Sequence, residues 1–173
     1  MLSRLLHNES FSRMPDALTE WDKRRLEVAH SVAGWSKDPK AKVGAVIADR
    51  QGRVIALGYN GFAAGIEDTD ERLNNNDEKQ ETILHAEMNA ILIANRLAEG
   101  SSLYVVGKPV CARCASIIIQ SGIRRVVGEY PDDPRSEWTA TGLRAIKMFT
   151  EANISFDSIQ DIGWVPLCKN GYP

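Results

Sequence analysis

Two short stretches, His85-Ala86-Glu87 and Cys111-Ala112-Arg113-Cys114, decide how this sequence folds and what chemistry it can perform. A zinc ion in a catalytic site takes three protein ligands and keeps a fourth position open for water. One histidine and two cysteines meet that count, so we expect one zinc ion per chain, bound by His85, Cys111 and Cys114. Glu87 is then free to accept and donate protons, which predicts a catalytic role for it instead of a ligand role.

The spacing of His85 and Glu87 restricts where they can lie in secondary structure. Residues two positions apart in an α-helix point about 200° away from each other, so both can face one metal ion only from the first turn. The apolar helical pattern begins at about Leu84, and the two cysteines also begin a predicted helix. Two helix N-termini are therefore expected to converge on the zinc, where their partial positive charge stabilises thiolates.

The chain is expected to form one domain. Residues 1–14 predict a flexible N-terminal arm, and residues 15–173 a single domain, which suits a chain of 173 residues. Two short apolar runs joined by Asp49-Arg50-Gln51-Gly52 predict a β-hairpin. Residues 65–79, which are acidic and rich in asparagine, predict a surface loop or lid.

The order of the elements indicates an α/β fold. The expected helices span residues 15–36, 84–98, 111–121 and 138–152, and the expected strands span 43–48, 54–59, 103–106, 125–130 and 154–156. Helices that alternate with strands in the second half imply parallel strands with right-handed crossovers. We therefore expect a three-layer α/β/α sandwich with a mixed, mostly parallel five-stranded sheet.

The composition bears on the substrate and on the compartment. Lys and Arg number 21 and Asp and Glu 23, so the formal net charge is −2. A substrate held by a polyanionic backbone needs a basic face, so we expect a small molecule and no nucleic-acid polymer. Three cysteines do not make a secreted disulfide framework, and no apolar run is long enough to span a bilayer. We expect a cytoplasmic protein without membrane contact.

A different assignment of the metal ligands stays open. His85, Cys111 and Cys114 could join Cys168 in a closed site of three cysteines and one histidine, which would be structural and non-catalytic. That assignment leaves Glu87 without a purpose. The chain would then be an inactive regulatory module that retains a structural zinc.

Further motifs accompany the metal pattern in order along the chain. They are Asp38-Pro39, Val43-Gly44-Ala45-Val46-Ile47, Gly58-Tyr59-Asn60-Gly61-Phe62, the stretch from His85 to Ile91, the stretch from Cys111 to Ala115, and the stretch from Ile118 to Ile123. Together with the H-x-E and C-x-x-C pattern of zinc-dependent nucleobase deaminases, they resemble the deoxycytidylate deaminase branch of the cytidine deaminase superfamily. The Gly-Tyr-Asn-Gly stretch separates this branch from tRNA adenosine deaminases.

The resemblance implies an activity and a set of substrate contacts. It implies hydrolytic conversion of dCMP to dUMP and ammonia, in which zinc-bound hydroxide attacks C4 and Glu87 shuttles protons. It also implies that Asn60 holds the sugar and that the backbone N–H of Ala86 binds the base carbonyl. Such enzymes are often hexamers regulated by dCTP and dTTP, so a homo-oligomer with these effectors is expected.

The sequence departs from the family pattern near the substrate. Val110 separates Pro109 from Cys111, where the family places proline directly before the cysteine. Phe62-Ala63-Ala64-Gly65 lacks the arginine that commonly follows Gly61. A modified cytosine nucleotide, dCTP or a purine base therefore stays an alternative substrate. Residues 65–82 contain no Cys or His, which predicts a single zinc.

Candidate cations for a substrate phosphate lie close to the metal motifs. Lys40 and Lys42 precede the first strand, and Arg113 lies at a helix N-terminus, which is a natural phosphate site. Lys42 and Arg113 are the expected contacts, with solvated surface charge as the alternative for the two lysines. Tyr130, at the end of a strand, is expected either to flank the base or to lie at the rim.

Overall fold

A five-stranded sheet in the order β2-β1-β3-β4-β5 forms the centre of the computed structural model, which describes residues 19–161 and 163–166. The strands are β1 (Gly44–Ala48), β2 (Val54–Tyr59), β3 (Ser102–Val106), β4 (Arg125–Gly128) and β5 (Ser155–Ser158). β1 pairs antiparallel with β2 and β3, whereas β4 pairs parallel with β3 and β5. Four strands therefore run in one direction and β1 runs against them, which confirms the mixed, mostly parallel sheet. The predicted arm at residues 1–14 and Cys168 lie outside the described residues.

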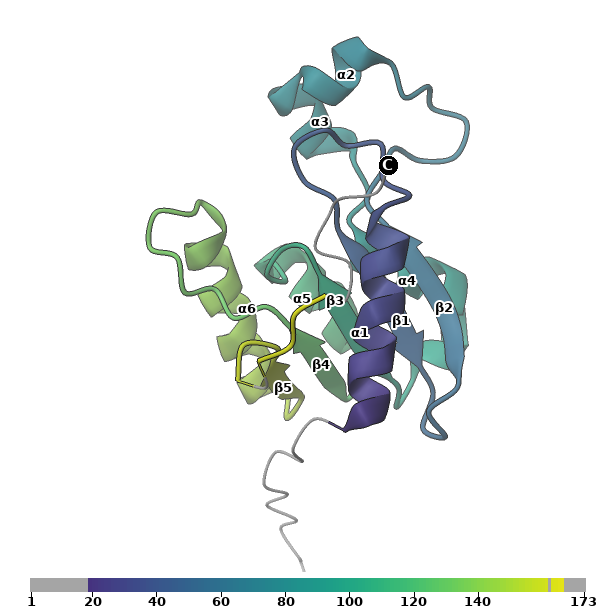
Figure 1. Cartoon of the computed structure of the whole chain (residues 1–173), viewed down its shortest axis with the longest axis vertical. Coiled ribbons are helices and arrows are strands. Elements are labelled where there is room, and N and C mark those ends of the chain that lie inside the picture. Colours follow the sequence, from purple (N-terminus) through teal and green to yellow (C-terminus); the bar gives the residue numbers. More distant parts are fainter. Residues whose placement is uncertain (1–18, 162, 167–173) are drawn as a thin grey trace, which may run out of the picture.

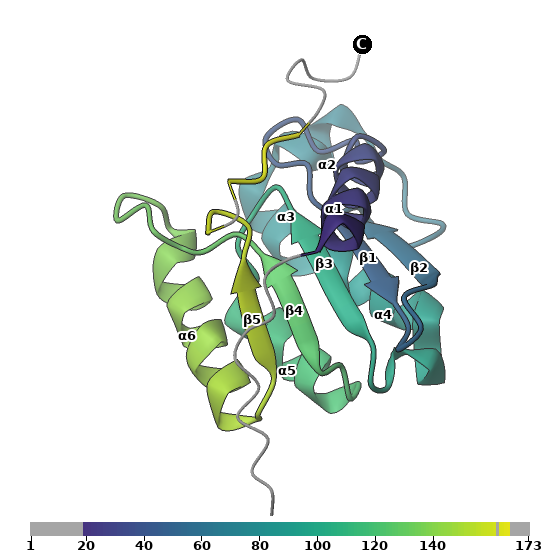
Figure 2. The same ribbon diagram turned by 60° about the horizontal axis from the view of Figure 1, so that its bottom comes forward.

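Helices cover both faces of this sheet, as Figures 1 and 2 show. They are α1 (Glu20–Ala33), α2 (Asp70–Asn74), α3 (Asn76–Thr82), α4 (Ala86–Ala94), α5 (Ala112–Gln120) and α6 (Trp138–Glu151), with a 3₁₀ turn, η1 (Asn95–Ala98). α1 packs on one face, and α4, α5 and α6 lie on the other. Side chains alternate along a strand, so Leu103 and Val105 join the core below α4 and α5, whereas Tyr104 and Val106 join the core below α1. The predicted three-layer sandwich is confirmed.

Most predicted elements are present with shorter ends. The helix expected over residues 84–98 ends as an α-helix at Ala94 and continues as η1. The strand expected over residues 125–130 ends at Gly128, so Tyr130 lies beyond it. Within the described part of the chain, no helix is both long and apolar enough to cross a membrane.

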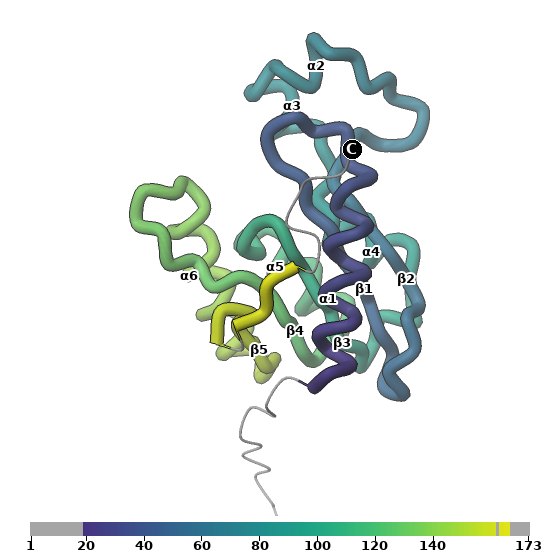
Figure 3. Tube along the Cα trace, viewed as in Figure 1, coloured from purple at the N-terminus to yellow at the C-terminus, as the bar shows by residue number. Residues whose placement is uncertain are grey.

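The segment predicted to be an irregular loop contains the two short helices α2 and α3, so that prediction was wrong. Thr69 caps α2 and Asn75 caps α3, each by accepting a backbone N–H with its side chain. The run of asparagines, which argued against a helix, supplies a favoured N-cap residue instead. Lys79 on α3 is buried and donates to Asp38 at 3.0 Å. The segment thus packs against the loop that precedes β1, at one end of the molecule (Figure 3).

A buried polar network holds α1 to the sheet. The Tyr104 hydroxyl donates to Asp22 Oδ1 at 2.6 Å, and Arg125 donates to the same oxygen at 2.9 Å and to Asp157 at 2.6 Å. Burial raises the pKa of Asp22, but the hydrogen bonds from Arg125 and Tyr104 outweigh burial and bring this pKa to about 2. The carboxylate therefore stays ionised at neutral pH and joins α1 to β3 and β4.

Two glycines allow helices to lie directly on strands. A Cβ at Gly44 would lie 1.9 Å from the carbonyl oxygen of Ala29 in α1, and a Cβ at Gly58 would lie 2.3 Å from the carbonyl oxygen of Ala86 in α4. Only glycine has no Cβ to occupy that space. Gly58 thereby determines how closely the first turn of α4 approaches β2.

We expect Gly58→Ala to push α4 away from β2, because the added methyl group would overlap backbone atoms of Ala86 and Ala90. Overpacking of this kind costs about 1–3 kcal/mol, and the displaced helix should also bind zinc more weakly. Thermal unfolding and zinc titration measure the two effects. Gly61→Ala is the matched control, because a Cβ there meets only the Tyr59 ring at 3.8 Å. Equal losses in the two variants would contradict the explanation.

Candidate active site

His85 and Glu87 lie at the start of α4, as their spacing predicted. His85 is the N-cap residue and has extended backbone angles, and its side chain makes no capping hydrogen bond. Ala86 and Glu87 belong to the first turn that follows. Because the two functional side chains leave the chain at the helix end, His85 and Glu87 line the same cavity.

The two cysteines lie at the start of α5. Cys111 is the N-cap residue, and its sulfur accepts the backbone N–H of Cys114 at 3.4 Å. The next backbone N–H, that of Ala112, donates to the Thr141 hydroxyl of α6 at 3.0 Å. Both sulfurs are buried, and hydrogen bonds at a helix N-terminus favour the thiolate form that binds metals.

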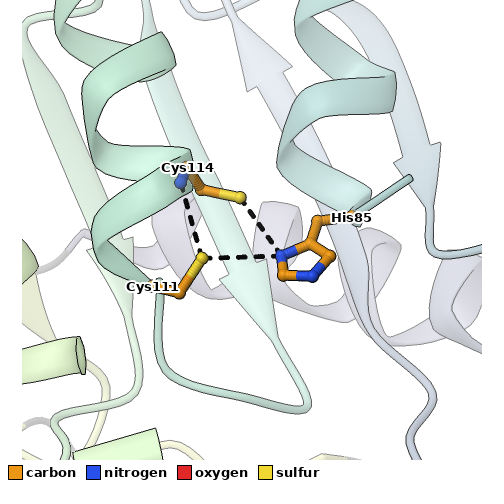
Figure 4. A group of neighbouring side chains, drawn as sticks. All are labelled: His85, Cys111 and Cys114. Atoms are coloured by element: carbon orange, nitrogen blue, oxygen red, sulfur yellow. Dashed lines mark hydrogen bonds between the residues drawn. The ribbon is translucent and has the colours of Figure 1, made fainter. Parts of the chain in front are cut away.

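These three side chains converge from two helix starts, as Figure 4 shows. His85 Nδ1 lies 3.6 Å from Cys111 Sγ and 3.3 Å from Cys114 Sγ, and the three atoms lie within 4.8 Å of one another. Tetrahedral zinc with Zn–S of about 2.3 Å and Zn–N of about 2.0–2.1 Å places its N and S ligands about 3.6 Å apart. The donor set therefore fits one zinc ion with three protein ligands.

The pKa values of the two cysteines shift in opposite directions. The hydrogen bond from Cys114 lowers the pKa of Cys111 to about 4, against the effect of burial, and His85 adds to this effect. The pKa of Cys114, which donates that bond and is buried, is raised. Zinc binding therefore releases the Cys114 proton, because only deprotonated sulfur is a good ligand.

Glu87 lies beside the ligands and outside the group of three donor atoms. Its side chain is buried, and burial raises its pKa, although the nearby His85 lowers it. A buried carboxyl group with a raised pKa next to a metal site is typical of residues that exchange protons with a substrate.

A cavity of about 270 Å³ opens beside this group. His85, Ala86 and Glu87 line its inner end, and its other walls come from the loop before β1, from α3 and from the start of α6. Asn60 also lines it. The Asn60 side chain accepts the N–H of Val43 at 2.8 Å and donates to the carbonyl of Ala41 at 2.8 Å, so it holds the loop before β1 against the end of β2.

Three residues predicted to touch the substrate do not line this cavity. Val43 lines it, whereas the preceding Lys42 is exposed, because successive residues of an extended chain face opposite sides. Arg113 is exposed between the two cysteines, and Tyr130, which is 42% exposed, lies past the end of β4. Lys42, Arg113 and Tyr130 are therefore absent from the lining of this cavity, and their contact with the substrate stays a prediction.

The cavity is also lined by residues that the motifs did not indicate as substrate contacts, among them Asp38, Lys79, Lys108 and Trp138. Lys79 and its partner Asp38 form a buried ion pair at the wall. The ring centre of Trp138 lies 6.0 Å from that of His85, and Lys108 Nζ lies 6.0 Å from the Trp138 ring. No local pattern marks Lys79, because its role depends on a helix that was not predicted.

Comparison with known proteins agrees with this site. Residues 19–129, more than half of the chain, match the family described as "Cytidine and deoxycytidylate deaminase zinc-binding region". An Aliivibrio fischeri protein named "Uncharacterized deaminase in luxG 3'region" is 38% identical over 154 residues, which cover 87% of this chain and 97% of that protein. Human deoxycytidylate deaminase is 36% identical over 165 residues, which cover 89% and 85% of the two chains.

Solved structures show the same fold. The apo structure of dCMP deaminase from the cyanophage S-TIM5 has a TM-score of 0.61 and 20% identity, covering 80% of this chain and 96% of that one. The same enzyme in complex with dCMP and dUMP gives a TM-score of 0.61 and 22% identity, covering 79% and 95%. With the matching family and the zinc donor set, these likenesses confirm the resemblance: the chain belongs to the cytidine and deoxycytidylate deaminase family and is a zinc-dependent deaminase.

Proposed function

We propose that this chain hydrolyses dCMP to dUMP and ammonia. The observation that carries the proposal is that His85, Ala86, Glu87 and Asn60 line one cavity beside the zinc donors. The names of the relatives support the substrate, since the human relative is a deoxycytidylate deaminase and the cyanophage enzyme was solved with dCMP and dUMP.

Glu87 is the proposed proton carrier. Zinc held by His85, Cys111 and Cys114 supplies a Lewis acid that lowers the pKa of a coordinated water to about 7. Glu87 accepts one proton from the attacking water and passes it to the ring nitrogen N3. It then takes the second proton from the hydroxyl group added at C4 and gives it to the leaving amine, so that ammonia departs and the C4 carbonyl forms. Because burial raises its pKa, Glu87 holds the proton between these steps more readily than an exposed glutamate would.

Ala86 and Asn60 are the proposed contacts that orient the nucleoside. The N–H of Ala86 lies in the first turn of α4, where backbone N–H groups have no partner within the helix, so it can donate to the base carbonyl. Asn60 Oδ1 accepts one N–H, that of Val43, and keeps a second lone pair for a sugar hydroxyl. Trp138 adds an apolar wall next to His85.

Other parts of the expected function stay predictions. They include assembly into a homo-oligomer such as a hexamer, control by dCTP and dTTP, and a cytoplasmic location. A modified cytosine nucleotide, dCTP or a purine base stays the alternative substrate, because Val110 and the Phe62-Ala63-Ala64-Gly65 stretch depart from the family pattern.

The substrate can be tested with zinc-loaded protein and a panel of dCMP, deoxycytidine, dCTP, 5-substituted dCMP, and adenine and guanine compounds. We expect the highest kcat/KM for dCMP, measured by ammonia release and by the change in ultraviolet absorbance. Absence of ammonia from every cytosine compound would refute the proposed function. A higher kcat/KM for dCTP or for a 5-substituted nucleotide would favour the alternative.

Replacing Glu87 separates chemistry from metal binding. Glu87→Gln keeps the shape of the side chain but cannot accept the proton, so kcat should fall by about 10²–10⁴-fold while one zinc per chain is retained. Elemental analysis and steady-state kinetics measure the two quantities. Glu81→Gln, which alters an exposed carboxylate on α3, serves as the control and should keep wild-type kinetics. An active Glu87→Gln enzyme is incompatible with the assigned role.

The ligand set can be tested by comparing two cysteines. Cys114→Ser removes a ligand from the open site, so the purified protein should contain clearly less than one zinc per chain. Cys168→Ser should leave the zinc content unchanged. Loss of zinc in Cys168→Ser would instead support the closed, structural site of three cysteines and one histidine.

A further inference from the structure

One wall of the cavity consists of α3 and the loop before β1, and it carries two lysines. Lys79 Nζ donates to Asp38 Oδ1 at 3.0 Å, and Lys40 Nζ donates to Asn76 Oδ1 at 2.7 Å. Asn76 and Lys79 are three positions apart on α3, so they lie on one side of the helix. All four residues line the cavity. We call them the α3 wall.

Asp38 holds the α3 wall together. Its Oδ1 also accepts the backbone N–H groups of Lys40 at 2.8 Å and Ala41 at 3.2 Å. The Asp38 and Lys79 side chains are only 4% and 10% exposed. A buried ion pair adds little stability compared with well-packed apolar side chains, so stability does not account for this pair. Lys79 gives one N–H to Asp38 and has two further donors.

The walls of the cavity differ in charge. On the α3 wall, Lys40 and Lys79 oppose Asp38, which leaves one positive charge in excess. Beyond it, Lys108 and Glu137 both line the cavity, and their charges cancel. A phosphate monoester carries about −1.5 to −2 at neutral pH. Its attraction to the protein is therefore greatest at the α3 wall, since Coulomb energy grows with the uncompensated charge nearby.

We propose that Lys40 and Lys79 bind the phosphate of a nucleoside monophosphate, so that the α3 wall makes the enzyme select phosphorylated substrates. The inference rests on the cytosine-nucleotide deamination proposed above and adds its phosphate site. It assigns to these two residues the role that the sequence had predicted for Lys42 and Arg113. Hydrogen bonds already hold both ammonium groups at one wall. Binding a phosphate there therefore costs less side-chain entropy than it would if the two lysines were free.

The test compares kcat/KM for dCMP with kcat/KM for deoxycytidine, which lacks only the phosphate. Lys40→Ala removes an exposed side chain and should lower the dCMP value about 10–100-fold, as expected for a lost hydrogen bond to a charged group. The deoxycytidine value should stay the same. Lys37→Ala is the control, because Lys37 precedes Lys40 in the same loop, pairs with Asp68 and does not line the cavity.

The role of Lys79 in phosphate binding is tested by replacing Lys79 and its partner Asp38 together. Asp38→Asn combined with Lys79→Met leaves no unpaired buried charge, and the double variant should show the same selective loss for dCMP. Its thermal unfolding is measured alongside. If the double variant is unfolded, Lys40→Ala alone decides. An unchanged preference for dCMP in Lys40→Ala, or a selective loss found instead in Lys42→Ala, Arg113→Ala or Lys108→Ala, overturns the proposed phosphate site.

Equilibrium binding separates this inference from the proposed function. Calorimetry on zinc-loaded protein compares dUMP with deoxyuridine, which requires no turnover. Tighter binding of dUMP that Lys40→Ala abolishes supports the phosphate site even if no cytosine compound is deaminated. Equal affinities for dUMP and deoxyuridine in the wild-type protein overturn the phosphate site even if cytosine compounds are deaminated.

Discussion

Two helix N-termini meet at the zinc ligands, and this convergence is the constraint on which the rest of the structure depends. His85 and Glu87 can serve one site only from the first turn of α4, and Cys111 caps α5 while its sulfur points to the same place. The sheet brings the two starts together, because α4 lies directly on β2 at Gly58 and α5 follows β3. The partial positive charge of both helix ends then favours the thiolates that hold the metal.

The cavity divides two tasks between different parts of the chain. The start of α4 contributes His85 and the proposed proton carrier Glu87 to the cavity, and the two cysteines at the start of α5 lie beside it. The α3 wall contains Lys79, from a helix that the sequence did not predict, and Asp38 and Lys40, from the loop before β1. Asn60 links the two, since its side chain holds the loop before β1 against the end of β2.

Periodicity in the sequence predicted most of the strands and the helices α4, α5 and α6, which cover the face of the sheet opposite α1. It could do so because alternation and helical spacing are local properties of the chain. The same reasoning failed for residues 65–79. Composition suggested a loop there, but Thr69 and Asn75 act as helix caps, and a helix as short as α3 depends on contacts with distant residues that a local pattern does not show. Lys42 and Arg113 were natural choices for a phosphate from their sequence positions, yet both side chains are exposed and neither lines the cavity.

The sequence by itself determined the metal donors and the layered α/β arrangement, and it predicted Glu87 as the proton carrier. These follow from residue types at short spacing, since three thiol and imidazole groups with a carboxylate at a helix start have few other uses. Only the tertiary structure decided which cations line the cavity. Lys79 and Asp38 are 41 residues apart, and the side of the chain that faces the cavity depends on how distant segments pack. No local pattern encodes that contact, because an ion pair forms only after the fold has brought its two partners together.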